Sequence, residues 1–359
     1  DIRLTARGAG QNSDLTVQGS HLAAVNTITL KADDEIRLLA AANTATQNST
    51  SKSSSASVGI SIGTDGLLFN VGASGGRGKG DGSDTSWSNS RVEAGQLLTL
   101  EAGGDTTLRG AVASGQQVIA KVGTSGQGKL LIESLQDTSN YSSKQQGAGF
   151  SLSLGPGKMS GSVSASQSKV NSDFASVAEQ SGLKAGDGGF QVEVKGDTDL
   201  KGALIASTQA AVDNNKNTFS TDGTLTLTDI QNRASYSARS VSVNLGTGLS
   251  FDGKLVPGGT SAGFGQDSGK AGSTTLAGIS GMAGNTAVRS GDRETGIARI
   301  FDADKVQKDI DAQVKITQMF GQLAPKAAAD FAVSRSKALK DQAGQESDIV
   351  KRAALYAEA

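Results

Sequence analysis

Three passages of the chain repeat one another at a nearly constant interval, and this period constrains the fold more than any single residue does. Each passage is an Asp followed by four residues and a glycine, and the glycines are Gly19, Gly110 and Gly202, at intervals of 91 and 92 residues. A second matching segment closes 44 or 45 residues later, at Gly63, Gly155 and Gly246. Repetition at a long fixed period favours an elongated array over a globular enzyme.

Apolar and polar residues alternate within each unit. One residue separates Ile28 from Leu30 and Leu98 from Leu100, and a period of two indicates strands with one buried face. Leu100 is matched 20 residues later by Ala120, beyond a turn. Short strands that return about every 20 residues fit the coils of a parallel β-helix.

A single coil of this kind cannot fold alone. Ordering about 20 residues costs roughly 20 to 40 kcal/mol of backbone entropy, whereas four inward-facing aliphatic side chains return only about 6 to 12 kcal/mol. Stacked coils bury both faces and pair their backbone groups with neighbours. We therefore predict a mainly β fold, a parallel β-helix or β-solenoid with repeated β-hairpin excursions and a short C-terminal helical segment. The solenoid is expected over residues 1–291, in units of about 14–104, 105–196 and 197–291.

The second half of each unit predicts a β-hairpin, because two alternating runs flank a glycine-containing turn. The turns are placed at residues 63–66, 155–157 and 246–248, and the third hairpin is expected to continue through Leu249 and Phe251. The apolar members of these hairpins are the candidate membrane- or partner-contact residues: Val58, Ile60, Ile62, Leu67, Phe69, Val71, Phe150, Leu152, Leu154, Val241, Val243 and Leu245.

Two interpretations of the hairpins remain open. They can leave the solenoid and lie along its side as an extra layer. Alternatively, strands with apolar residues on one face and small polar residues on the other are typical of membrane β-strands. The second interpretation requires further strands to close the unpaired edges, because an open edge is not tolerated in lipid.

A helical pattern begins near the end of the chain. Asp302 is the expected N-cap, and apolar residues are expected on one helix face. These residues are Val306, Ile310, Val314, Ile316, Phe320 and Leu323. Pro325 is expected to end or kink this helix, and a second, Ala-rich helix should follow to about Lys340. Residues 292–359 are thus expected to form a Gly-rich linker and an α-helical segment.

Several motifs resemble catalytic or binding sites but have simpler explanations. Residues 123–129 match most of a phosphate-binding loop, yet Leu130 stands where Ser or Thr would hold Mg²⁺, so a turn between two coils is expected. Residues 75–81 resemble one calcium-binding nonapeptide without its tandem repeats, and a loop is expected there. Ser261 fits a nucleophile-elbow pattern, but the chain has a single histidine, His21, to serve as its base.

The composition also argues against catalysis and against nucleic acid as a partner. The repeated Asp14, Asp105 and Asp197 are explained by turn chemistry. The chain has no cysteine and a net charge of −1, and it shows no basic stripe for nucleic acid. We therefore predict no catalytic, cofactor-binding or metal-binding residues, no cofactor, and no enzyme activity.

Two sets of segments carry a resemblance to a known family. The coils at residues 19–24 and 110–114 resemble the haemagglutinin repeats of two-partner-secreted, filamentous-haemagglutinin-like proteins of Gram-negative bacteria. The helix at residues 300–307 and 318–323, following a Gly/Ser-rich repeat region, is similar to the start of the pretoxin segment in CdiA-type contact-dependent growth inhibition effectors. The resemblance covers nearly the whole chain, which we expect to be a piece of a longer protein.

The resemblance implies a non-catalytic module of a secreted toxin-delivery protein. In that family the second repeat region is held in the producing cell, released on contact, and associates with the target-cell outer membrane so that a C-terminal toxin can enter. The implied partners are that outer membrane or an outer-membrane protein, a two-partner-secretion transporter during export, and a toxin domain in cis. The implied location is the secreted or cell-surface fraction, with periplasmic retention before release. The alternative is an adhesin stalk or a host- or cell-binding surface.

Overall fold

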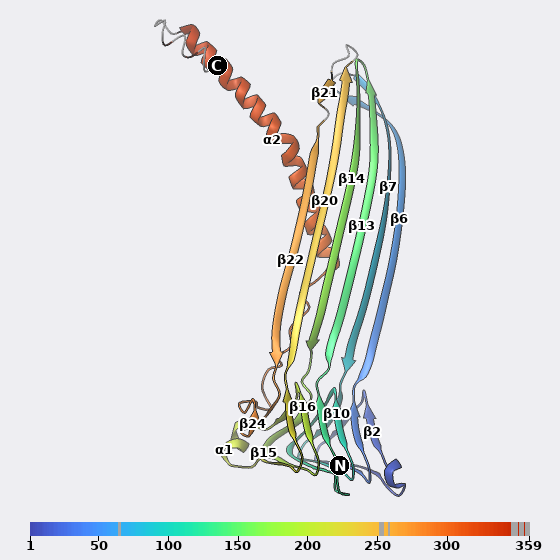
Figure 1. Ribbon diagram of the computed structural model, residues 1–359, viewed down its shortest axis with the longest axis vertical. Helices are drawn as coiled ribbons and strands as arrows, with labels where there is room; N and C mark the ends of the chain where they lie inside the picture. Colours follow the sequence, from blue (N-terminus) through green and yellow to red (C-terminus); the bar gives the residue numbers. More distant parts are fainter. Residues whose placement is uncertain (64–65, 251–254, 258, 346–350, 352–354, 356–359) are drawn as a thin grey trace.

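The computed structural model describes residues 1–63, 66–250, 255–257, 259–345, 351 and 355. A β-helix forms the base, a tall antiparallel sheet rises from it, and one long helix leans on that sheet (Figure 1). The prediction of a mainly β solenoid with hairpin excursions is confirmed.

One side of the β-helix is a six-stranded parallel sheet, to which each coil contributes one strand. Its order is β2 (Leu15–Gln18), β5 (Ile36–Leu39), β10 (Thr106–Arg109), β12 (Leu130–Glu133), β16 (Thr198–Lys201) and β19 (Leu225–Thr228). The first five strands bury alternate residues, as the period of two predicted. In β19, at the end of the sheet, the alternate residues Leu225 and Leu227 are half-buried. The buried ladder runs from Leu38 to Leu108, Ile132 and Leu200, one residue per coil.

The other sides of the β-helix belong to an 11-stranded sheet. Its strands are β1 (Ile2–Ala6), β3 (His21–Ala24), β4 (Thr27–Ala32), β8 (Ser90–Ala94), β9 (Leu97–Ala102), β11 (Ala111–Val122), β15 (Gly182–Val194), β17 (Leu204–Ala206), β18 (Thr218–Thr221), β23 (Gly278–Ile279) and β24 (Ala283–Gly284). Leu100 pairs with Leu30 on one side and with Ala120 on the other, and all three are buried. The predicted return after 20 residues is therefore one coil. Two short helices, η1 (Gly10–Asn12) and α1 (Gln209–Asp213), lie outside the sheets.

The repeated glycines form the tight corners at which the chain passes directly from the six-stranded sheet to the 11-stranded sheet. All three have positive φ angles, of 53° at Gly19, 61° at Gly110 and 53° at Gly202, a region that favours glycine. The repeated aspartates accept hydrogen bonds from backbone N–H groups of an adjacent coil: Glu35 to Asp14 (3.3 Å), Lys129 to Asp105 (2.7 Å) and Thr224 to Asp197 (3.0 Å). The aspartates follow turns, but these hydrogen bonds join neighbouring coils and do not close the aspartates' own turns.

At every second coil the same corner carries a hairpin instead of a glycine turn. The hairpins leave after β5, β12 and β19 and return at β8, β15 and β23. They comprise β6 (Ala41–Gly63) with β7 (Gly66–Ser88), β13 (Gln136–Gly155) with β14 (Lys158–Val177), and β20 (Ile230–Ser250) with β21 (Leu255–Pro257) and β22 (Ser261–Thr275). Together they form a seven-stranded antiparallel sheet, which we call the hairpin sheet.

The spacing of coils and strands explains why separate hairpins join into one sheet. Neighbouring strands lie about 4.8 Å apart, so two coils advance the base by roughly 9.6 Å. One hairpin contributes two strands and therefore needs the same width. The second strand of each hairpin consequently pairs with the first strand of the next, as β7 does with β13 and β14 with β20.

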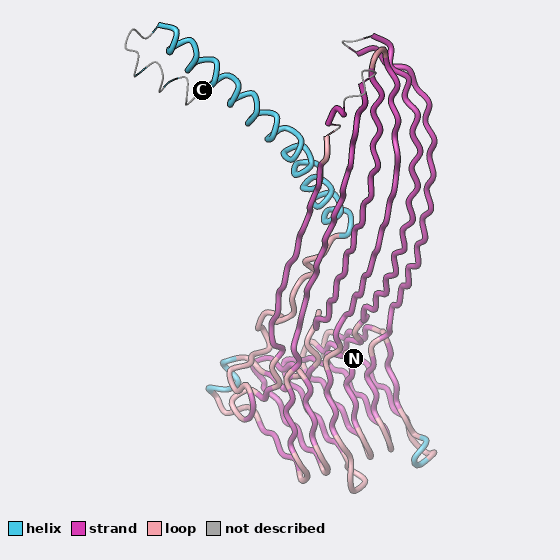
Figure 2. The backbone as a smooth tube through the Cα atoms, turned by 45° about the horizontal axis from the view of Figure 1, so that its top comes forward, coloured by secondary structure: helices cyan, strands magenta, loops and turns pink. Residues whose placement is uncertain are grey.

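Three expectations about the hairpins are wrong. The hairpin sheet stands away from the β-helix rather than lying along its side (Figure 2), because its strands pair with one another along almost their whole length. Residues 246–248 are not a turn but part of β20, where they pair with β14. Residues 75–81 are not a loop but the middle of β7, paired on both sides. Thr64, Asp65 and Phe251 lie outside the described residues.

The terminal helix α2 spans Ala303–Gln345. Its predicted N-cap is confirmed, because Asp302 accepts a hydrogen bond from the Lys305 N–H at 3.0 Å. The prediction that Pro325 separates two helices is wrong, since α2 continues through it as one element. The Ala-rich residues that follow have high helix propensity, which lets the helix resume at once and makes the segment longer than expected.

Candidate membrane- and partner-contact surface

All twelve candidate contact residues lie on one face of the hairpin sheet. Directly paired residues of antiparallel strands share a face, as do residues two positions apart. One such row runs across five strands through Ile60, Phe69, Leu154, Met159 and Leu249. The remaining candidates are at even offsets from this row: Val58, Ile62, Leu67, Val71, Phe150, Leu152, Val241, Val243 and Leu245. We call this surface the apolar band.

The apolar band is open to solvent. Val58 and Ile62 are 84% and 85% exposed, Leu152 is half-buried, and the other candidates are exposed. From Val241 to Leu249 a strand rising about 3.4 Å per residue advances roughly 27 Å, which is the height of the band on β20.

Four further apolar residues complete the band and were not among the candidates. They are Met159, Val163, Leu249 and Phe264, and each is exposed. Val163 pairs directly with the candidate Phe150, and Phe264 pairs with Val241. The alternation of Met159, Gly161 and Val163 carried the same signal as the first strand of that hairpin and would have identified two of the four.

The opposite face of the hairpin sheet is built from glycine and serine. Serine hydroxyls bond across strands, as between Ser55 and Ser74 or Ser151 and Ser162, both at 2.7 Å. A Cβ atom at Gly78 would approach the Ser51 Oγ to 2.6 Å, so this glycine fits closely beside its neighbour. The glycine and serine side chains are small, so this part of the polar face is nearly flat.

Helix α2 packs on this glycine- and serine-rich face. Val306 and Ile310 are buried against Val170 and Ala238 of the sheet. A Cβ at Gly263 of β22 would lie only 2.7 Å from the Val314 carbonyl oxygen, so the helix comes close to the strand backbone. The expectation of a single apolar helix face is wrong, because Ile316, Phe320 and Leu323 point away from this contact and are exposed.

The helix also satisfies the outer edge of the hairpin sheet at β22. The Phe264 N–H donates to the Thr317 Oγ1 at 2.8 Å, and the Gln266 N–H donates to the Gln313 Oε1 at 2.9 Å. Edge strands with unpaired backbone groups readily pair with other chains. Side chains of α2 therefore occupy donors on β22 that would otherwise invite a further strand.

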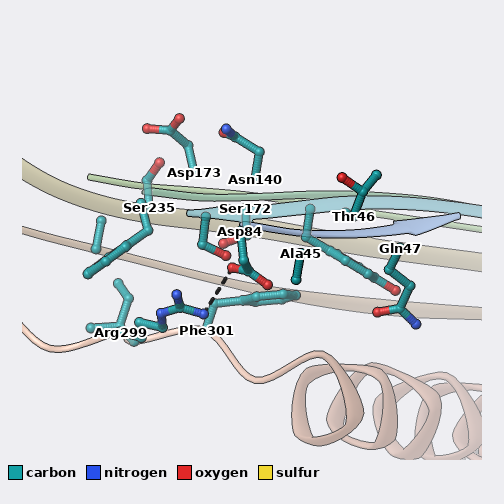
Figure 3. A pocket seen from close by; sticks show the side chains of 16 residues that line it. Ala45, Thr46, Gln47, Asp84, Asn140, Ser172, Asp173, Ser235, Arg299 and Phe301 are labelled. Carbon is teal, nitrogen blue, oxygen red and sulfur yellow. Dashed lines mark hydrogen bonds and ion pairs between the residues drawn. The ribbon is translucent and has the colours of Figure 1, made fainter. Parts of the chain in front are cut away.

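The segment before the helix is anchored to the same face (Figure 3). The Phe301 ring lies between Tyr141 and Tyr236, with ring centroids 5.4 and 5.7 Å away. Arg299 forms an ion pair with Asp84 at 3.0 Å. A cavity of about 230 Å³ is lined by Phe301, Tyr141, Arg299 and Asp84, among others. Burial and a hydrogen bond to Asp267 raise the pKa of Tyr236, so its hydroxyl remains a donor at neutral pH.

The motifs that resemble catalytic sites do not assemble into one. Ser261 is buried in β22, whereas His21 is in β3 of the β-helix and contacts Glu93 at 2.9 Å. Residues 123–129 form the turn between β11 and β12, as predicted. Among the described residues no three His, Cys, Asp or Glu side chains converge in a metal-binding group, and none of the helices in those ranges is long and apolar enough to cross a membrane.

A family model described as the hemagglutinin repeat matches residues 1–148 and 142–219. The chain is 36% identical to a tRNA nuclease CdiA of Escherichia coli (strain NC101), over 95% of this chain and 11% of that protein. It is 37% identical to a deoxyribonuclease CdiA of Dickeya dadantii, over 90% and 10%. A deoxyribonuclease CdiA of Yersinia pseudotuberculosis is 34% identical, over 96% and 32%. No solved structure matches the chain. The chain therefore spans about a tenth of the length of the first two relatives.

Proposed function

The chain belongs to the haemagglutinin-repeat family and is a CdiA-like, filamentous-haemagglutinin-type sequence, and on that premise we propose that it is a non-catalytic module of a secreted toxin-delivery protein. Its role is to associate with the outer membrane of a target cell, or with a protein in that membrane, while a C-terminal toxin crosses. The proposed location is the surface of a Gram-negative bacterium, after periplasmic retention and export by a two-partner-secretion transporter. Nuclease activity is named for the relatives and is not proposed for this module.

The apolar band is the observation that carries this proposal. It joins apolar side chains of every long strand of the hairpin sheet into one exposed surface. Large contiguous apolar surfaces on a protein in water mark contact sites for proteins or membranes. The band contributes nothing to the core of the β-helix, which is a separate cluster, so burial within the chain does not explain it.

The dimensions of the band agree with those of a membrane. Apolar bands on membrane-spanning β-strands are about 25 Å tall, close to the roughly 27 Å from Val241 to Leu249 on β20. Strands β6, β7, β13 and β14 are 20 to 23 residues long, so the band covers only the part far from the β-helix. We propose that this distal part contacts lipid while the proximal part holds it clear of the base.

The proposed division of the chain is compatible with this arrangement. We propose that residues 1–291 form the haemagglutinin-repeat solenoid, in units of about 14–104, 105–196 and 197–291. Residues 292–359 then serve as the linker and helical segment that leads to a pretoxin region and a toxin in cis. The anchoring of Phe301 and the packing of α2 on the sheet support a mechanical connection between the two parts.

The absence of cysteine in the chain permits a direct test by single-cysteine labelling. Val58→Cys places a polarity-sensitive dye on the apolar band, and Ser57→Cys, the adjacent residue, places it on the opposite face of β6. With vesicles of outer-membrane lipids, we expect a blue shift and protection from aqueous quenchers at position 58 and a much smaller change at position 57. If neither dye responds to any lipid composition, the membrane role is refuted and an adhesin stalk is the better explanation.

A further inference from the structure

A row of positive charges crosses the hairpin sheet on the same face as the apolar band. Lys79 of β7 pairs directly with Lys144 of β13, Lys144 with Lys169 of β14, and Lys169 with Arg239 of β20. All four side chains are exposed. We call these four residues the cation row.

The cation row is not explained by the stability of the sheet. Like charges at directly opposed positions on neighbouring strands are destabilising, and this row has three such pairs in succession. Lys79 has an ion pair with Asp81 at 3.0 Å. Within the described ranges no carboxylate forms an ion pair with Lys144, Lys169 or Arg239. Since the whole chain has a net charge of −1, the row is a local concentration of charge and not a general property of the protein.

The position of the cation row relative to the apolar band indicates which kind of surface the row contacts. Arg239 is two residues from Val241 on β20, so the row begins roughly 7 Å below the edge of the band. On the same face, Lys52 and Arg77 pair across β6 and β7 at the level of Val241. A surface that is apolar and then cationic along one axis matches a lipid leaflet, which is apolar inside and carries phosphate at its boundary.

Nothing in the described chain covers this face. Helix α2 packs on the opposite face, at Gly263 and in the buried cluster that contains Val170. Lysine and arginine side chains are long enough to reach outward from a strand while their aliphatic stems stay near the apolar surface. The cations are therefore free to contact a surface against which the apolar band lies.

We propose that the cation row binds the phosphate groups of anionic lipids and sets how deep the hairpin sheet enters a lipid surface. This inference rests on the proposed function, because it requires the apolar band to lie against lipid. Each cation near an anionic leaflet strengthens binding about five-fold, and the effect weakens with salt.

Binding of the full chain to phosphatidylcholine vesicles, with and without phosphatidylglycerol, tests the proposal. We expect Lys144→Gln combined with Lys169→Gln to weaken binding to the phosphatidylglycerol vesicles roughly 25-fold at low salt. The pair Lys144→Arg and Lys169→Arg should bind as the unaltered chain does. As a matched control, Lys121→Gln with Lys216→Gln removes the same charge from exposed positions on the β-helix and should have no effect.

Separate outcomes distinguish this inference from the proposed function. Phe69→Ser with Phe150→Ser, on the apolar band, should weaken binding to both kinds of vesicle. If that variant loses binding while Lys144→Gln with Lys169→Gln binds normally to phosphatidylglycerol vesicles, the cation row is refuted and the membrane role stands. If binding depends on the lysines, is fully reversed by salt and is indifferent to the phenylalanines, the apolar contact is refuted, and the proposed role of the cation row in setting depth is refuted with it. Equal binding by all variants refutes both.

Discussion

Replacing Gly110 by alanine should destabilise the β-helix more than the same exchange at Gly10 or Gly59. Gly110 forms the corner between β10 and β11, with a φ angle of 61°. An added Cβ would lie 2.6 Å from the Ala40 Cβ and 2.9 Å from the Leu135 Cδ1. Ala40 cannot move aside without moving the backbone, because a methyl group has no rotamer to change.

The destabilisation by Gly110→Ala has two causes, and alanine substitutions at two other glycines distinguish them. A left-handed conformation costs a residue with a Cβ about 1 to 2 kcal/mol, and overpacking a filled site costs about 1 to 3 kcal/mol. Gly110→Ala should therefore lower the free energy of unfolding by about 2 to 5 kcal/mol. Gly10 has a φ of 58° but nothing near its Cβ position, so Gly10→Ala should cost about 1 kcal/mol. Gly59 has neither constraint, and Gly59→Ala should stay within about 0.5 kcal/mol of the unaltered chain.

Urea unfolding measures all three variants. Trp87 is the chain's one tryptophan, and it lies at the root of the first hairpin, where its Nε1 donates to the Gln136 carbonyl at 3.1 Å. Its fluorescence reports the corner region, and circular dichroism reports the strands as a whole, since a repeat array need not unfold in one step. The reasoning is refuted if Gly110→Ala unfolds at the same urea concentration as Gly10→Ala.

Three further results are expected. Burial raises the pKa of Glu133, but hydrogen bonds from Lys201 and Arg109 outweigh it and leave that pKa below its usual value; the contact therefore stabilises the fold at neutral pH and is lost as the pH falls through the folded-state pKa. Glu133→Gln should cost about 1 kcal/mol at pH 7 and flatten the acid limb of a stability–pH curve, and an unchanged limb would contradict this. Phe301→Ala should speed amide exchange in the first turns of α2 by removing two ring contacts worth about 1 kcal/mol each; unchanged exchange would show that the ring is not the anchor. Lys144→Gln should raise the free energy of unfolding by about 0.5 kcal/mol, and a lower free energy of unfolding would mean that the cation row is structural.

Features determined by nearest neighbours along the chain were predictable from the sequence. The alternation around Leu100 and the N-cap at Asp302 depend on strand period and helix capping. The candidate contact residues also emerged on one face, because the side-chain period of a strand is two and each hairpin preserves it.

Features determined by pairing between distant segments were not predictable. The glycines of residues 75–81 have low strand propensity, yet they lie in β7 because partners on both sides supply ladder hydrogen bonds. The turn expected at residues 246–248 is overridden for the same reason, since β14 pairs with β20 through that region. The cation row could not be recognised in the sequence, because its members come from four strands and are up to 160 residues apart.

Two coils of the β-helix advance by the width of one hairpin, and this match limits how such a protein can change its size during evolution. Duplicating a whole 91-residue unit lengthens the β-helix by two coils and widens the hairpin sheet by the same distance. Losing a single plain coil would bring two hairpins to half the separation that their four strands need. Copy number should therefore vary in whole units among relatives. The width of the apolar band should then change in steps of one hairpin.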